Sequence, residues 1–217
     1  FAGSLTEGSD HPFTADADPL ATTLYLDSTD FAVGDEVLVG WTITDDFIAE
    51  HSMTGVWTEF NGEWRGFFRR TVTAVATGEL TLDVPLRYSA KMRDGASVRA
   101  ATGYLSECGI EDIAISNAQD WDVAWTTNQV HAVWFSQVKD CWMRGVESFA
   151  SPYVTDGTGT HLISSGVLVN QSRRVTIADT TLSNAAHRGD GGNGYPFEVR
   201  QSNEILTRDS VATDGRH

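Results

Sequence analysis

The fold is decided by three stretches of sequence that repeat one pattern: AVWFSQVKDCWMRGVESF (132–149), GVLVNQSRRVTIADTTLS (166–183) and PFEVRQSNEILTRDSVAT (196–213). When they are stacked, Gln137, Gln171 and Gln201 fall in one column, at spacings of 34 and 30 residues. Apolar residues alternate with polar ones inside each stretch, which indicates strands. Aligned apolar columns are typical of a solenoid with stacked coils. These columns are Val133/Val167/Phe197, Phe135/Val169/Val199 and Cys141/Val175/Ile205.

The pattern extends back over a partial coil, in which Ile110 matches Met143. The same frame places Cys108 beside Cys141, and we expect two buried free thiols because side chains stacked in register do not easily reach disulfide geometry. The Gln column lies at the last inward position before a bend, where amide side chains can hydrogen-bond from coil to coil. We therefore predict an all-β, right-handed parallel β-helix (a solenoid) over residues 101–217.

The rest of the chain is organised differently. Residues 1–20 are polar and rich in Gly, Asp and Pro, and we expect an extended arm or linker there. Residues 21–100 combine short alternating runs with Gly-Asp and Asp-Gly turns, which predicts a small β-rich module resembling a sandwich or a small barrel. Within it, residues 51–70 are aromatic and arginine-rich. They are either a sugar-binding aromatic loop or, as we favour, a strand whose rings pack on the neighbouring domain.

Composition excludes some classes of partner. Fifteen basic and thirty acidic residues among 217 give a net charge of −15. An acidic surface argues against nucleic acid, because affinity for nucleic acid depends largely on cationic contacts to phosphate. No apolar run approaches the length of a membrane span. Two cysteines cannot form a disulfide framework.

The segments SRRVTIADTTL (172–182) and SNEILTRDSVA (202–212) resemble the coil element of the right-handed parallel β-helix, or pectate-lyase-like, superfamily. This resemblance implies a secreted or cell-surface, carbohydrate-active domain that cleaves or binds an extracellular polysaccharide by lyase or glycoside hydrolase chemistry. The alternative is a non-catalytic structural β-helix of an adhesin, fibre or tailspike-type assembly. The chain matches neither the catalytic Arg motif of pectate lyases nor the paired-Asp motif of polygalacturonases.

The candidate catalytic residues lie in loops. The coils are longer than three strands require, and the excess falls at one corner, in segments 117–130, 150–165 and 184–195. Loops stacked at one corner build the walls of a groove, where functional residues concentrate. Two imidazoles at equivalent places in successive coils, with neighbouring Arg and Asp, could abstract a proton or neutralise a uronate carboxylate. The residues are His187, Arg188, Asp190 and His217.

The candidate substrate-binding residues lie in the same loops and on one strand. The loop residues are Trp121, Trp125, His161 and Tyr195. On the outward face of the strand at 197–200, Glu198 and Arg200 share a side because they are two positions apart. They are either a second part of the groove or an exposed salt bridge that contributes little.

Two further expectations concern cofactors and partners. The sequence specifies no cofactor with certainty, although the acidic and histidine residues of the corner could hold a metal, with calcium the candidate. The chain stops in mid-coil without a capping segment. Because an open solenoid end exposes strand edges and core, we expect further coils, an oligomer or an additional chain to cover it.

Overall fold

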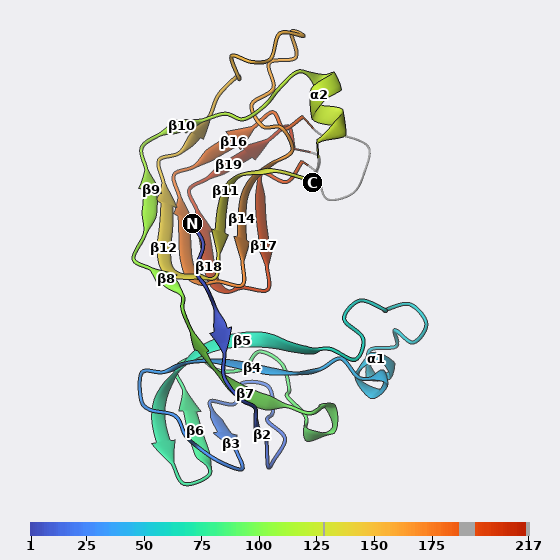
Figure 1. Ribbon diagram of the computed structural model, residues 1–217, viewed down its shortest axis with the longest axis vertical. Coiled ribbons are helices and arrows are strands. Elements are labelled where there is room, and N and C mark those ends of the chain that lie inside the picture. Colours follow the sequence, from blue (N-terminus) through green and yellow to red (C-terminus); the bar gives the residue numbers. More distant parts are fainter. Residues whose placement is uncertain (128, 187–193, 216–217) are drawn as a thin grey trace. The chain divides into compact units, whose positions relative to one another are not determined.

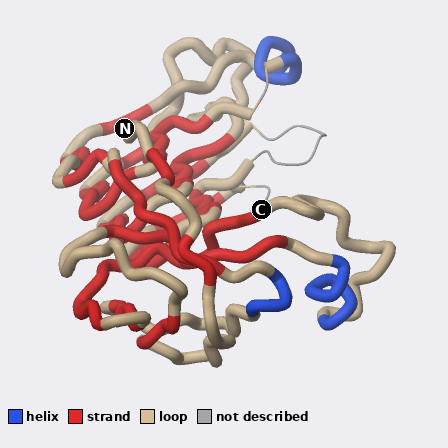
Figure 2. Tube along the Cα trace, turned by 60° about the horizontal axis from the view of Figure 1, so that its bottom comes forward, coloured by secondary structure: helices blue, strands red, loops and turns tan. Residues whose placement is uncertain are grey.

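The computed structural model of the protein describes residues 1–127, 129–186 and 194–215. The chain divides into two compact units, which are Leu5–Gly103 and a second unit of Phe1–Ser4 together with Tyr104–His217 (Figure 1). We call them the N-terminal unit and the β-helix unit. Both consist mainly of strands, and their helices are short (Figure 2).

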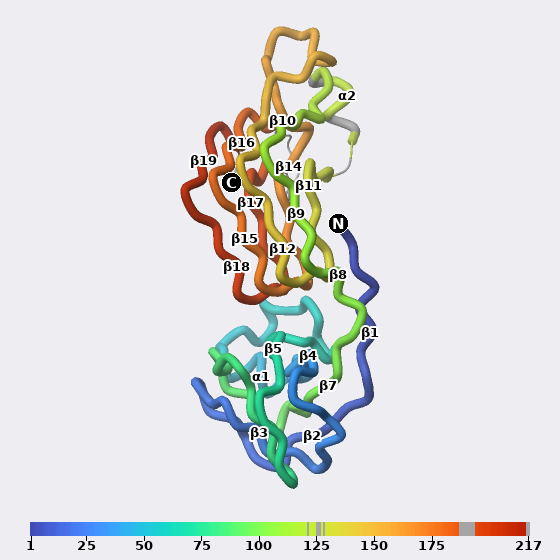
Figure 3. The backbone as a smooth tube through the Cα atoms, turned by 90° about the vertical axis from the view of Figure 1, so that its left-hand side faces the viewer, coloured from blue at the N-terminus to red at the C-terminus, as the bar shows by residue number. Residues whose placement is uncertain are grey.

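The β-helix unit confirms the predicted parallel β-helix. Its coils place parallel strands side by side in three sheets (Figure 3). The first sheet contains β11 (His131–Ser136), β14 (Ser165–Asn170) and β17 (Phe197–Arg200). The second contains β8 (Leu105–Ser106), β9 (Gly109–Glu111), β12 (Val138–Arg144), β15 (Arg173–Ala178) and β18 (Asn203–Arg208). The third contains β10 (Ala114–Ile115), β13 (Glu147–Ser148), β16 (Thr181–Ser183) and β19 (Val211–Thr213).

The register of the coils is the one that the repeats predict. Val133 pairs with Val167, which pairs with Phe197. The other two predicted columns, Phe135/Val169/Val199 and Cys141/Val175/Ile205, are also in register. These side chains point inward and, apart from Val199 in the last coil, belong to one apolar cluster. Each fully buried large aliphatic or aromatic side chain contributes roughly 1.5–3 kcal/mol, so the stacking of coil on coil stabilises this unit.

The bends between strands use residues in the left-handed conformation. Gln137, Gln171 and Gln201 have φ values of 55°, 49° and 46°. Their side chains form the predicted ladder, in which Nε2 of each donates to Oε1 of the next at 3.1 and 3.2 Å. Positive φ recurs in register at the bend after the second sheet, in Asp112/Gly145/Asp179/Asp209. It also recurs at Glu107/Asp140/Arg174/Glu204, where the last three residues lie within β12, β15 and β18.

The N-terminal residues belong to the first coil of the β-helix. Ala2 pairs in parallel with Ser136, so residues 1–3 lie beside β11. The Phe1 ring stacks on Phe135, with the ring centroids 4.9 Å apart and the planes at 10°. Phe1 therefore extends the inward column of Phe135 by one coil.

The N-terminal unit is inserted at a bend of this first coil. Leu105 pairs with Val138, as Ala2 pairs with Ser136. In the second coil only Gln137 separates the two paired positions, whereas in the first coil residues 3–104 separate them. The entire N-terminal unit therefore leaves and re-enters the β-helix at the bend that the Gln column forms in later coils.

The N-terminal unit is an antiparallel sheet in the order β1-β7-β4-β5-β6-β3, with β2 beside β7. Residues 5–20, expected as part of an arm or linker, contribute two short strands to it. A buried cluster that includes Val39 and Leu80 forms its core. The strands are β1 (Thr6–Glu7), β2 (His11–Pro12), β3 (Thr23–Tyr25), β4 (Glu36–Thr42), β5 (Trp64–Ala76), β6 (Glu79–Leu82) and β7 (Ser97–Thr102). The helices are α1 (Asp45–Glu50) and the 3-10 helix η1 (Met92–Asp94).

Candidate functional site

Three long connections of the β-helix unit lie at one corner of the coil, between the third and first sheets. They follow β10, β13 and β16 and lead into β11, β14 and β17, as the sequence predicts. The first of them contains α2 (Trp121–Thr126). Figure 1 shows α2 and the connection after β13 on the same side of the stacked coils. We call these connections the corner loops.

Hydrogen bonds join the corner loops to each other. The Asp120 carboxylate accepts from the Thr155 hydroxyl at 2.6 Å, from the Thr155 amide and from the Asp156 amide at 3.1 Å. These hydrogen bonds hold the pKa of Asp120 below its usual value, and the bonds from Thr155 make the largest contribution. Ser151 donates to the Ala118 carbonyl at 2.6 Å. The loop after β13 is thereby attached to the loop that carries α2.

His161 links neighbouring coils. Its Nδ1 lies 3.0 Å from the Ser148 hydroxyl and 3.1 Å from the Ser183 hydroxyl. Its Nε2 lies 3.2 Å from the Asn184 side-chain amide. Partial burial lowers the pKa of His161, so the neutral imidazole is favoured. These contacts use both ring nitrogens within the coil stack, and the role of His161 in substrate binding stays a prediction.

Two columns of residues run across the outward face of the first sheet. Trp134, Leu168 and Glu198 are in register, as are Ser136, Asn170 and Arg200. Trp134 is 51% exposed, whereas Leu168 is buried. A large exposed indole therefore stands two strands away from a charged pair.

Glu198 and Arg200 meet on this face and share a third partner. The Glu198 carboxylate accepts from the Arg200 guanidinium through Oε1 and from the Gln129 amide through Oε2 at 3.4 Å. Arg200 donates in turn to Oε1 of Gln129 at 3.3 Å. The side chain of Glu198 is 12% exposed and that of Arg200 is 46% exposed. The sequence identified the pair but missed Gln129, because no periodic signal shows that its loop crosses to β17.

His131 lies at the start of β11, near this pair. Burial is the main cause that lowers its pKa, while Glu198 acts in the opposite direction. Among the described residues, its Nδ1 is buried without a hydrogen-bond partner, and so is the hydroxyl of Ser165, its register partner on β14. Tyr195 precedes β17, and its carbonyl accepts from the Gly166 amide at 2.9 Å. A partly buried imidazole with an unsatisfied nitrogen thus lies within electrostatic range of Glu198.

The four candidate catalytic residues lie outside the described part of the structure. They are His187, Arg188, Asp190 and His217. Trp121 and Trp125 belong to α2, and their side chains are also outside it. Within the described ranges, no three His, Cys, Asp or Glu side chains are grouped so that they could hold a metal ion. No helix in these ranges has the length and apolar character that a membrane crossing needs.

The described part of this face offers binding groups and one carboxylate. Glycoside hydrolysis uses two carboxyl groups roughly 5–9.5 Å apart. Glu198 supplies one, hydrogen-bonded to a cation and an amide, and the predicted second, Asp190, lies outside the described residues. We call the surface formed by Gln129, Trp134, Glu198 and Arg200 the strand-face cluster, and His131 lies next to it at the start of β11.

Comparison with known proteins identifies the fold. No protein-family model and no curated protein matches the chain. Solved structures of three phage tailspikes are similar. The tailspike gp49 of Pseudomonas phage LKA1 has a TM-score of 0.53 and 12% identity, over 98% of this chain and 38% of the tailspike.

The other two tailspikes give similar values. The tailspike gp61 of Pseudomonas phage phi297 has a TM-score of 0.50 and 13% identity, over 96% of this chain and 34% of its own length. Gp54 of Acinetobacter baumannii phage AP22, solved with A. baumannii capsular saccharide, has a TM-score of 0.50 and 10% identity, over 98% of this chain and 34% of its own length. The chain thus spans little more than a third of these tailspikes, and the similarity is one of fold.

Proposed function

We propose that the β-helix unit binds an extracellular polysaccharide on the outward face of its first sheet and cleaves it by lyase or hydrolase chemistry. The strand-face cluster carries this proposal. Its exposed Trp134 ring offers a flat apolar surface, and Glu198, Arg200 and Gln129 offer donors and acceptors nearby. A sugar ring has one apolar face and a rim of hydroxyls, so it matches this combination.

The comparisons support the same proposal. Gp54 of phage AP22 was solved with a capsular saccharide, on a fold similar to this one. By analogy of fold, we assign this chain to a secreted or cell-surface protein of tailspike type, within the broader pectate-lyase-like group. The chemistry of the strand-face cluster is an independent reason for the choice of ligand.

The proposed catalysis combines the strand-face cluster with the loop after β16. Glu198 acts as a general acid or base, and His187, Arg188, Asp190 and His217 complete the site from the adjoining segments. His131 adds a neutral base beside Glu198, because burial lowers its pKa. Calcium is the metal that these acidic loops would take.

A non-catalytic structural role is the second candidate, and the last coil favours it. Val199 belongs to an inward column yet is 50% exposed, and Leu206 and Val211, which face outward in the columns of Thr176 and Thr181, are 50% and 48% exposed on the same coil. Apolar surface of this kind marks an interface. We propose that a further coil or another chain covers this end in the assembled protein.

Binding and turnover assays on one panel of acidic and neutral bacterial polysaccharides test both roles. Trp134→Ala is expected to weaken binding at least about tenfold without lowering the melting temperature. Tyr25→Ala, an exposed aromatic change in the N-terminal unit, is the control. Unchanged binding by Trp134→Ala contradicts the binding proposal.

Glu198→Gln tests catalysis separately. It keeps the shape of the side chain and is expected to abolish new reducing ends or unsaturated products while binding persists. Binding without turnover on any glycan of the panel, together with self-association of the chain, would favour the structural role.

A further inference from the structure

The N-terminal unit contains an aromatic cavity of about 250 Å³ that the proposed function does not use. Six aromatic rings and the imidazole of His51 line it. Trp41 comes from β4, Phe47 from α1, Trp57 from the connection between α1 and β5, and Tyr88 from the connection between β6 and η1. Segments far apart in the sequence therefore converge on one small space.

The rings of the cavity are held by packing. Trp41 is 2% exposed and stacks on Phe67, with the centroids 4.2 Å apart. Thr44 caps α1 by accepting a hydrogen bond from the Phe47 amide at 3.0 Å, which fixes the first turn of the helix. Phe47 meets Trp57 edge to face at 5.8 Å.

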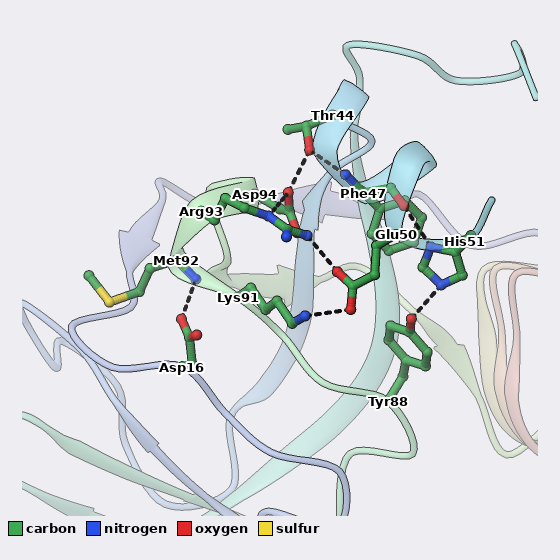
Figure 4. A network of polar contacts seen from close by, with 10 residues as sticks. All are labelled: Asp16, Thr44, Phe47, Glu50, His51, Tyr88, Lys91, Met92, Arg93 and Asp94. Carbon is green, nitrogen blue, oxygen red and sulfur yellow. Dashed lines mark hydrogen bonds and ion pairs between the residues drawn. The ribbon is translucent and has the colours of Figure 1, made fainter. Parts of the chain in front are cut away.

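A polar network clamps α1 to the segment around η1 (Figure 4). The Thr44 hydroxyl donates to buried Asp94 at 2.5 Å. Lys91 and Arg93 donate to Glu50 at 2.5 and 2.7 Å. The hydrogen bonds from Lys91, which has the larger effect, and from Arg93 lower the pKa of Glu50 to about 2. The helix wall of the cavity is thus fixed before any ligand arrives, which reduces the entropic cost of binding.

The hydrogen-bonding groups of the cavity are few and their roles can be assigned. His51 Nδ1 lies 2.6 Å from the Phe47 carbonyl, which only accepts, so Nδ1 carries the proton. In the neutral ring Nε2 then accepts from the Tyr88 hydroxyl (Figure 4). The Tyr88 oxygen keeps a lone pair for a ligand. Within the described residues, the buried Nε1 of Trp41 has no partner and is an unused donor.

We propose that this cavity binds one neutral, methyl-bearing sugar ring, such as a 6-deoxyhexose or an N-acetylhexosamine residue. The choice of a sugar rests on the proposed function. The cavity is smaller than pockets for drug-sized ligands, which favours a single ring. Among the described residues, no Asp, Glu, Lys or Arg lines the cavity, so a charged ligand would lose water without gaining a counter-ion there.

The methyl group follows from the shortage of polar partners. An unmodified hexose would bury several hydroxyls against apolar rings, and each unpaired hydroxyl weakens binding. A deoxy or N-acetyl sugar replaces a hydroxyl with apolar surface that the aromatic walls can cover. The Trp41 donor and the Tyr88 acceptor can then pair with a hydroxyl at the buried edge of the ring, and the other polar groups of the sugar stay in water at the open mouth of the cavity.

The test uses the full chain with 6-deoxy-D-glucose and N-acetyl-D-glucosamine, and with D-glucose as the common parent sugar that lacks the methyl group. Binding is followed by ligand-observed saturation-transfer NMR and by tryptophan fluorescence. Both methyl-bearing sugars are expected to bind about tenfold more tightly than glucose. Trp57→Ala is expected to weaken them at least about tenfold. Tyr88→Phe removes only the hydroxyl and is expected to weaken them severalfold, with Tyr153→Phe as the matched control.

The outcomes separate this site from the strand-face cluster. Trp134→Ala should leave monosaccharide binding unchanged, and Trp57→Ala should leave polysaccharide contact at the first sheet intact. If the chain binds polysaccharide but shows no monosaccharide binding that depends on Trp57, the cavity proposal alone is overturned. If it binds monosaccharides through Trp57 but binds no polysaccharide at the first sheet, the proposed function alone is rejected. Tetramethylammonium binding that depends on Trp57, without sugar binding, would reassign the cavity to a cation and also overturn the proposal.

Discussion

Gln137 and Gln171 lie on successive coils, share a left-handed backbone conformation and are joined by a hydrogen bond of 3.1 Å from Nε2 of Gln137 to Oε1 of Gln171. A left-handed non-glycine residue costs about 1–3 kcal/mol. A side-chain hydrogen bond contributes about 0.5–1.5 kcal/mol. The ladder therefore offsets much of the strain at the bend, and it links the coils at the same time.

The middle of the ladder should be its most sensitive point. Gln171→Ala loses the bonds to both Gln137 and Gln201 and keeps the positive φ, so we expect the free energy of unfolding to fall by about 1–3 kcal/mol. Gln171→Gly should cost less than Gln171→Ala because glycine adopts the bend without strain. Gln201→Ala loses one bond at an exposed position and is the control. Urea unfolding measures the three, and a larger loss for glycine than for alanine would contradict the strain argument.

Gly145 should resist substitution for two reasons. Its φ is +61°, and an added Cβ would lie 2.3 Å from Oδ1 of Asp112 on the preceding coil. We expect Gly145→Ala to destabilise the protein by about 1–3 kcal/mol. Asp112→Ala in the same chain should recover part of that loss, because the clash disappears while the backbone strain remains. Strictly additive effects in this double-mutant cycle would rule out the contact as a cause.

The pH dependence of stability should carry a contribution from His161. Its pKa is lower in the folded chain than the usual value near 6.5, mainly because of burial. Below about pH 6.5, His161 binds a proton more readily in the unfolded chain than in the folded chain. The contribution of His161 to folding stability is therefore complete above about pH 6.5 and is lost as the pH falls toward the pKa of the folded state. His161→Gln should show a flatter loss of stability between about pH 7 and pH 5. Identical slopes for the two proteins would show that His161 does not titrate in this range.

The two cysteines should differ in reactivity although they lie on neighbouring coils. Both are free, Cys141 is 2% exposed and Cys108 is half-buried. Burial raises the pKa of the Cys141 thiol, which disfavours the reactive thiolate. We expect Ellman's reagent to modify Cys108 at least about tenfold faster than Cys141 in the native chain. In the Cys108→Ser variant, only Cys141 can react, so its modification rate is measured alone. Rapid modification of this variant would contradict the prediction.

The β-helix could be predicted because each coil repeats one pattern over about 18 positions, so the Gln and apolar columns and their register followed from alignment. The insertion of the N-terminal unit into the first coil could not be predicted in this way. Only three residues, at 1–3, pair in the first sheet, which is too short a segment to show a period. Phe1 is one apolar residue at the end of a polar stretch, and its place above Phe135 depends on a pairing 134 positions away.

The candidate site was predicted in part. Glu198 and Arg200 share a face by strand geometry, and the structure brings them together. Gln129 reaches them from a loop, where no periodicity constrains the path of the chain. Two interpretations of the aromatic segment 51–70 were open. In the structure, Trp57 and Phe67 of this segment line a cavity within their own unit. Trp41, which completes the wall, comes from a different strand, and the composition of the segment could not indicate that contact.

The place at which the N-terminal unit joins the β-helix bears on how such proteins diversify. Its two connections emerge from positions that are occupied, one coil later, by residues on either side of Gln137. Its ends are therefore close together, as in modules that tolerate transfer between hosts. A module attached in this way can be exchanged, or replaced by one bend residue, without shifting the register of any later strand. Recombination can thus replace the whole N-terminal unit while the β-helix scaffold is inherited unaltered.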